Sequence, residues 1–272
     1  MKEQGQAGRI ASCILPAIVF SLVFELAAAA LELCRGAVLA RGSGAVFAWM
    51  IRNPADGTAF RTALSLGIAG LALLRTSRAE DRAYRLAATP VSRHGEPAAL
   101  LVLTVTLSLG INLALSLAGV TGGSADTGRV SPVPGLLVYG VLSPMVEELV
   151  FRGCLIPRCE RLRQSLPAPV HRGIRLRQLI PVALSSLLFA LYHGNLPQGI
   201  YAFMMGLVLG AAYERTHRLE VCVCMHAAAN IVSLVLSATG LYAPLVSPGG
   251  IAAAFTAAGC CVLFLAERRT HK

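Results

Sequence analysis

Long apolar runs separated by short polar segments dominate the chain. An α-helix needs about 20 mostly apolar residues to cross a bilayer, and eight runs reach or approach that length. They lie at about 10–33, 59–74, 97–120, 135–148, 178–194, 198–213, 219–239 and 250–266. The pattern predicts an all-α, polytopic integral membrane protein with about eight transmembrane helices.

The first two runs need separate comment. The run at 10–33 follows a short polar stretch with Lys2 and Arg9, as in a signal peptide. Its length and the apolar character of the remaining chain favour an uncleaved first helix instead. Residues 35–58 read as a mixed loop, and the run at 59–74, interrupted by Arg61, is a second span of marginal length.

Composition supports the membrane assignment. The 272 residues are 55% hydrophobic and 14% charged, with a mean hydropathy of +0.65, which is too apolar for an ordinary soluble domain. The net charge of +10 does not indicate a nucleic-acid partner, because the arginines are concentrated in short segments between apolar runs. In that position they set the orientation of a membrane protein.

Positive charge distinguishes the two sides of the predicted bundle. The connections after the second, fourth and sixth helices and both chain ends are basic, whereas segments 121–134, 194–197 and 240–249 carry almost no positive charge. The positive-inside rule then places both termini in the cytoplasm, in a protein that we expect in the plasma membrane. The first loop, with Arg35, Arg41 and Arg52, is the exception.

We expect one structural domain in three parts. Residues 1–129 hold the first three helices, 130–240 a core of helices four to seven, and 241–272 the last helix and a basic tail. The eight cysteines form no CxxC pair and are expected to be reduced. Gly206 and Gly210 have the spacing of a small-residue helix-packing face.

The stretch SPMVEELVFRG at 143–153 places ionisable side chains beside a long apolar run, where they are energetically costly and usually functional. On a helix, Glu148 and Arg152 share one face and are close enough to form an ion pair. Glu147 points about 100° away from Glu148. The spacing therefore predicts a structural pair and a second carboxylate that is free to act as a general base.

Two further motifs place polar groups on helices. Phe189 and His193 in FALYH, like His226 and Asn230 in HAAAN, are four residues apart and so share a helix face. Counted along the helices, these groups and Glu147 reach similar depths. We expect them to meet in a polar cavity open to the cytoplasm, with the composition of a hydrolytic site.

Each motif also has a plainer interpretation. Glu-Glu-Arg also occurs on solvated helices. Phe189 with His193 is often a core aromatic side chain beside a histidine whose hydrogen bonds are satisfied. Gly206 and Gly210 need no role beyond helix packing. His226 near Cys222 and Cys224 suggests a metal site, but CVCMH lacks familiar zinc spacing and the chain has no HExxH.

The three motifs together, in this order across eight spans, resemble the EExxxR, FxxxH and HxxxN motifs of the CPBP family of CAAX-protease and bacteriocin-processing membrane proteins. The resemblance covers about residues 130–240. It implies that Glu147 and His193 activate water and that His226 and Asn230 hold the oxyanion. It also implies that Glu148 and Arg152, with Phe189 of the second motif, support the site.

The expected function is therefore intramembrane endopeptidase activity on a peptide or membrane-anchored protein within membrane lipid. We expect no cofactor, since the residues are compatible with zinc at His193 and His226 without requiring it. The long arginine-rich connection between Arg152 and Phe189 departs from the family pattern. It leaves open whether the substrate is prenylated. The alternatives are a non-catalytic partner of another membrane protein and, disfavoured by the lack of an inverted repeat, a small-solute transporter.

Overall fold

The computed structural model describes residues 6–76, 96–120, 130–165 and 174–270, and all the elements formed by these residues are helices. The long helices are α1 (Gln6–Arg41), α3 (Pro54–Thr76), α5 (Glu96–Leu117), α10 (Ile174–Tyr192), α11 (Leu196–Thr216), α12 (Leu219–Ala238) and α14 (Pro248–Thr270). Short helices are α2 (Ala45–Arg52) and α13 (Tyr242–Leu245). Residues 132–165 form a further helical stretch, described below. The predicted polar connections at 75–96 and 121–134 and the middle of the basic connection lie largely outside the described residues.

Seven helical stretches in the described part of the chain are long and apolar enough to cross a membrane. The remaining predicted span, the fifth at 178–194, corresponds to α10, whose apolar part is shorter, Leu179–Tyr192. This confirms the all-helical polytopic prediction, but the first loop was predicted wrongly. α1 runs on to Arg41, α2 occupies Ala45–Arg52 and α3 begins at Pro54, so the three helices together fill most of the expected loop.

An ion pair compensates the charge that interrupts the second span. Arg61 donates to Glu32 of α1 at 3.2 Å, and Glu32 also pairs with Arg35 at 2.5 Å. The Arg61 charge is therefore compensated where α3 packs against α1. Glu32 in turn has two cationic partners, one on its own helix and one on α3.

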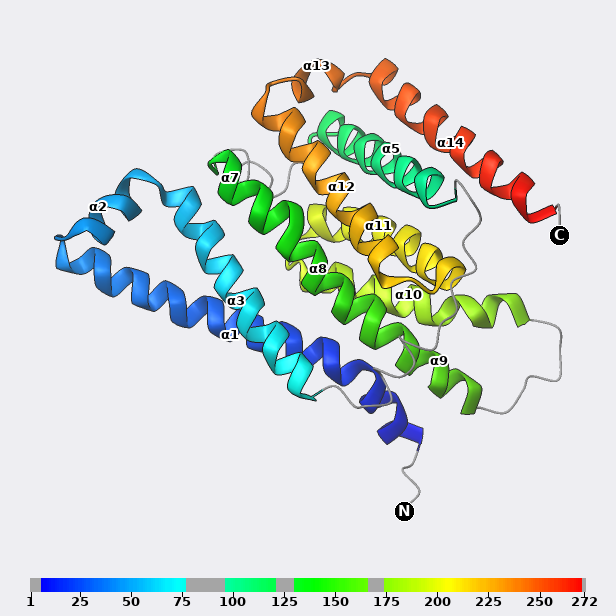
Figure 1. Ribbon diagram of the computed structural model, residues 1–272, viewed down its shortest axis with the longest axis horizontal. Helices are drawn as coiled ribbons and strands as arrows, with labels where there is room; N and C mark the ends of the chain where they lie inside the picture. Colours follow the sequence, from blue (N-terminus) through cyan, green and yellow to red (C-terminus); the bar gives the residue numbers. More distant parts are fainter. Residues whose placement is uncertain (1–5, 77–95, 121–129, 166–173, 271–272) are drawn as a thin grey trace.

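The helices form a bundle whose centre holds the three motifs on separate elements. Figure 1 shows α1 and α3 together on one flank and α5 and α14 together on the other, with α8, α11 and α12 between them. The start of α1 lies toward the bottom of this view, and the end of α9, the start of α10 and the end of α14 lie toward the right. α2, α7 and α13 lie toward the upper left.

The central helical stretch departs from regular α geometry on both sides of the glutamate pair. It comprises α7 (Pro132–Gly135), the π-helical η1 (Leu136–Leu142), α8 (Ser143–Glu148), the π-helical η2 (Leu149–Leu155) and α9 (Ile156–Ser165). Pro144 has no N–H to donate to the preceding turn, which is a local cause for the break at η1. π-Helical turns are rare and frequently accompany functional sites.

Gly206 and Gly210 let α11 approach α10 closely, as their spacing predicts. A Cβ on Gly206 would lie 2.9 Å from Ser186 Cβ and 3.0 Å from its Cα. A Cβ on Gly210 would lie 2.7 Å from Val182 Cγ1. Because backbone as well as side chain would have to move at Gly206, only glycine fits this crossing without displacement.

We expect Gly206→Ala to lower the free energy of unfolding by roughly 1–3 kcal/mol, the usual cost of overpacking. Thermal unfolding of the detergent-solubilised protein measures this. Gly259→Ala in α14 is the matched control, because no atom lies within 4 Å of its added Cβ. Equal unfolding temperatures for the two variants would show that the α10–α11 crossing tolerates a methyl group.

Candidate active site

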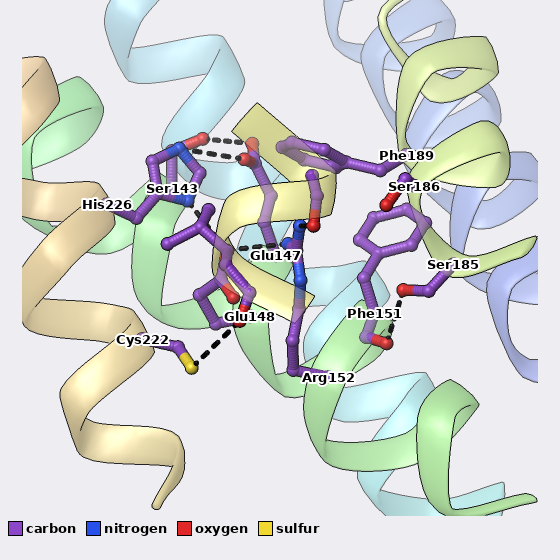
Figure 2. Close-up of polar contacts among 12 residues, drawn as sticks. Ser143, Glu147, Glu148, Phe151, Arg152, Ser185, Ser186, Phe189, Cys222 and His226 are labelled. Carbon is purple, nitrogen blue, oxygen red and sulfur yellow. Dashed lines mark hydrogen bonds and ion pairs between the residues drawn. The ribbon is translucent and has the colours of Figure 1, made fainter. Parts of the chain in front are cut away.

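A buried ion pair forms the base of the site. Arg152 Nη1 donates to Glu148 Oε1 at 2.7 Å, and both side chains are fully buried. The predicted pair between these residues is thus confirmed. The other guanidinium nitrogen, Nη2, donates to the Gly206 carbonyl at 3.3 Å, which links η2 to the close crossing of α11. Figure 2 shows this pair turned toward His226 on the neighbouring helix.

Glu148 also fixes the imidazole of His226. Its Oε1 lies 2.8 Å from His226 Nδ1. A carboxylate only accepts hydrogen bonds, so Nδ1 carries a proton in this arrangement. The ring orientation leaves Nε2 facing Glu147, with 3.8 Å between Nε2 and Glu147 Oε2. One ion-paired carboxylate therefore orients the histidine of the third motif.

Phe189 supports both histidines from one position on α10. Its ring meets the His193 ring at 4.8 Å and the His226 ring at 5.8 Å between centroids, nearly perpendicular in each case. Arg152 Cζ lies 4.7 Å from the same ring centroid, within cation–π range. The side chain is buried, so Phe189 is a fixed wall of the site that contacts the guanidinium and both imidazoles.

Glu147 has a hydrogen-bond partner that the sequence reasoning missed. Ser143, one turn earlier on α8, donates to Glu147 Oε1 at 2.5 Å (Figure 2). The expectation of a wholly free carboxylate was wrong in this respect. The i, i+4 spacing of Ser143 and Glu147 was the available signal. The bond holds one oxygen and leaves Oε2 directed toward His226.

His193 and Asn230 complete the predicted set. His193 Nδ1 lies 2.9 Å from the Phe189 carbonyl, so this nitrogen is the donor and Nε2 is the unprotonated nitrogen of the neutral ring. Asn230 Nδ2 donates to the Tyr139 carbonyl of η1 at 2.9 Å, and the amide keeps a second N–H. Both side chains line the same cavity as Glu147 and His226.

The cavity has a volume of about 390 Å³, within the range of small-molecule and peptide sites. Beyond the predicted residues, its walls include side chains that the motifs did not reveal. These are Phe24, Glu25, Thr62, Tyr139, Ser143, Tyr192, Gln198, Tyr201, Ala202, Met205, Ser233, Leu234 and Ser237. Among them is Glu25 of α1, a carboxylate from a helix that carries none of the three motifs.

The cavity lies toward one end of the bundle. Most of its lining residues lie in the halves of the helices that are farther from the basic connections: His193 follows the last residue of α10, and Ser237 is near the end of α12. Glu147 and His193 line the cavity together, in agreement with the similar depths expected from the sequence. The expected opening of the cavity to the cytoplasm stays a prediction.

Comparison with known proteins was informative for the central part of the chain. Residues 129–232 match the Rce1-like family of type II CAAX prenyl endopeptidases. The Rce1-like segment contains all seven residues of the three motifs, and the resemblance predicted from those motifs is confirmed at family level. Neither a search of curated proteins nor one of solved structures gave a match.

The Rce1-like segment brings together a carboxylate, two imidazoles and an amide around one cavity. Such a set supplies a base for water and hydrogen-bond donors for a developing oxyanion. Within the described residues, no group of three or more His, Cys, Asp or Glu side chains is arranged to hold a metal ion. The eight cysteines have no disulfide bonds, and Cys222 and Cys224 differ in exposure.

We expect Arg152→Met to lower the free energy of unfolding by about 3–5 kcal/mol, because it leaves the Glu148 carboxylate buried without its cation. Thermal unfolding in detergent is the measurement. Arg218→Met is the matched control, since Arg218 pairs with Glu220 at 2.6 Å on the surface, where a pair contributes about 0–1 kcal/mol. An Arg152→Met variant as stable as Arg218→Met would contradict a structural role for the buried pair.

Proposed function

We propose that the protein is an intramembrane endopeptidase that hydrolyses a peptide bond with a water molecule activated by Glu147. The observation that carries the proposal is the convergence of Glu147, His193, His226 and Asn230 on one cavity, inside a segment that matches an endopeptidase family. The substrate is a peptide or a membrane-anchored protein within membrane lipid.

The nucleophilic water is placed between Glu147 and His226. The 3.8 Å between Glu147 Oε2 and His226 Nε2 is too long for a direct hydrogen bond, and one water can bridge two polar atoms at such a separation. Ser143 holds the other oxygen of Glu147. Glu147 takes a proton from the water as its oxygen attacks the scissile carbonyl carbon, with His193 Nε2 as a second acceptor nearby.

Stabilisation of the oxyanion falls to His226 and Asn230. Since Nδ1 of His226 donates to Glu148, donation from Nε2 as well requires the imidazolium form, and two carboxylates face that charge. The second N–H of Asn230 is the other donor. When the intermediate collapses, the C–N bond breaks and Glu147 returns its proton to the leaving amine.

Removal of the Glu147 carboxylate, the proposed general base, tests this mechanism. We expect Glu147→Gln to reduce kcat for cleavage of a fluorogenic peptide by at least about 100-fold, because a positioned general base contributes about 10²–10⁴. His226→Ala should reduce kcat by about 10²–10³, the usual value of one oxyanion donor. The panel includes prenylated tails and unmodified peptides, assayed with purified protein in detergent. Glu220→Gln, outside the cavity, is the control.

Two outcomes would separate this proposal from the alternative of a non-catalytic partner protein. A substrate cut equally well by wild type and Glu147→Gln would remove Glu147 from the mechanism. The second outcome is that the wild type cleaves none of the panel. If wild type and Glu147→Gln then both retain the same membrane partner without any cleavage product, that result would favour the non-catalytic function.

A chelator tests the absence of a metal from the mechanism. We expect activity to survive zinc chelation, because the proposed base, acceptor and donors are all side chains. Cleavage rates before and after dialysis against the chelator are compared, followed by zinc addition. Loss of activity that zinc restores would make His193 and His226 metal ligands instead.

A further inference from the structure

We propose that Pro144 and Gly140 are positioning residues for Asn230, because together they present the Tyr139 carbonyl of η1 to the Asn230 amide. This inference rests on the proposed function, in which Asn230 is one of two oxyanion donors, and it adds the residues that fix this donor. Neither Pro144 nor Gly140 belongs to the EExxxR, FxxxH or HxxxN pattern. Both lie on the helical stretch that leads into the glutamate pair.

Each π-helical segment of the central stretch accepts a hydrogen bond from a side chain of another helix. In η1, Asn230 Nδ2 of α12 donates to the Tyr139 carbonyl at 2.9 Å. In η2, the buried Ser185 hydroxyl of α10 donates to the Phe151 carbonyl at 2.8 Å. A regular α-helix bonds each carbonyl to the N–H four residues later, and a π turn moves that bond to the fifth residue. The irregular turns are thus the places where neighbouring helices anchor polar side chains.

Pro144 and the π turn decide which backbone donors compete with Asn230 for the Tyr139 carbonyl. In a regular α-helix the N–H of Ser143 would donate to this carbonyl. At the end of η1 the Ser143 N–H donates instead to the Val138 carbonyl, five residues back. The corresponding π-type bond to Tyr139 would have to come from residue 144, and proline has no N–H. Neither of these two backbone positions therefore competes with the Asn230 amide.

Gly140 sets the separation of η1 and α12 beside this hydrogen bond. Gly140 follows Tyr139 in the chain as Ile231 follows Asn230, so the close contact and the hydrogen bond are adjacent. A Cβ on Gly140 would lie 2.9 Å from Ile231 Cγ1, a separation too short for two carbon atoms in contact. A side chain at position 140 would push η1 away from α12 and lengthen the 2.9 Å bond from Asn230 to Tyr139.

The anchored amide retains one N–H for the substrate. The amide nitrogen carries two N–H groups, and the Tyr139 carbonyl accepts one of them. Asn230 and Tyr139 both line the cavity. A donor that is fixed before the reaction needs no reorganisation when the oxyanion forms. Loss of the anchor should therefore lower kcat with little change in KM, because the oxyanion exists only after the substrate has bound.

A double-substitution cycle in kcat tests the assignment. Pro144→Ala restores an N–H at position 144 and favours a regular helix, so we expect the variant to fold. It should lower kcat about 10-fold, a part of the roughly 10²–10³-fold value of one oxyanion donor, and leave KM within about twofold. In an Asn230→Ala background the same substitution should lower kcat by less than about twofold.

Gly140→Ala provides a second, independent variant, because it acts through the separation of the helices and not through a restored N–H. We expect the same pattern, a loss of kcat in the parent chain that nearly disappears in the Asn230→Ala background.

Pro132→Ala and Gly135→Ala are the matched controls on the same helical stretch. Pro132 is at the first position of α7, where a helix N–H has no intrahelical partner in any case. A Cβ on Gly135 would lie 3.8 Å from Val130 Cγ1, an ordinary contact. Neither control should lower kcat in either background.

Thermal unfolding of the same variants in detergent provides a measurement that needs no catalysis. Asn230→Ala should lower Tm by about 2–4 °C in the parent chain, the effect of one hydrogen bond, and by less than about 1 °C in the Pro144→Ala chain. Additive Tm shifts would overturn the proposal, as would an equal fractional loss of kcat from Pro144→Ala with and without Asn230. If the wild type cleaves no peptide, that result counts against the proposed function, and the Tm cycle alone decides whether Pro144 and Gly140 hold Asn230.

Discussion

The ion pair between Glu148 and Arg152 is the interaction on which the rest of the site depends. Two opposite charges in a fully buried position remain ionised only as a pair, because the loss of either partner leaves the other without compensation. The same Glu148 oxygen bonds His226, and the same guanidinium bonds the Gly206 carbonyl and faces the Phe189 ring. Helices α8, α10, α11 and α12 are thereby tied together at one point.

The same contacts explain why the close crossing of α10 and α11 matters for the candidate catalytic groups. Arg152 reaches the Gly206 carbonyl only because α11 lies against α10 without an intervening side chain. The crossing positions Phe189, whose ring contacts both imidazoles. Packing, electrostatics and the orientation of the candidate catalytic groups are therefore consequences of the same few contacts. The orphaned Oε2 of Glu148 and Nε of Arg152, buried without hydrogen-bond partners among the described residues, add to the cost of disturbing them.

The wall of the cavity is uneven in polarity. Phe189 and Met205 contribute buried apolar side chains, whereas Gln198, Ser233 and Ser237 contribute amide and hydroxyl groups. Such polar groups matter for the proposed peptide substrate, because an unpaired backbone amide is costly inside the bilayer.

Local spacing determined much of this protein. Apolar runs predicted the helices, since helix length and bilayer thickness are linked, and the i, i+4 spacing predicted the Glu148–Arg152 pair and the shared faces of His193 and His226. Only the tertiary structure decided that Glu32 compensates Arg61 and that Glu25 reaches the cavity. These depend on contacts between helices far apart in the chain, and no periodicity within one helix encodes which neighbour it meets.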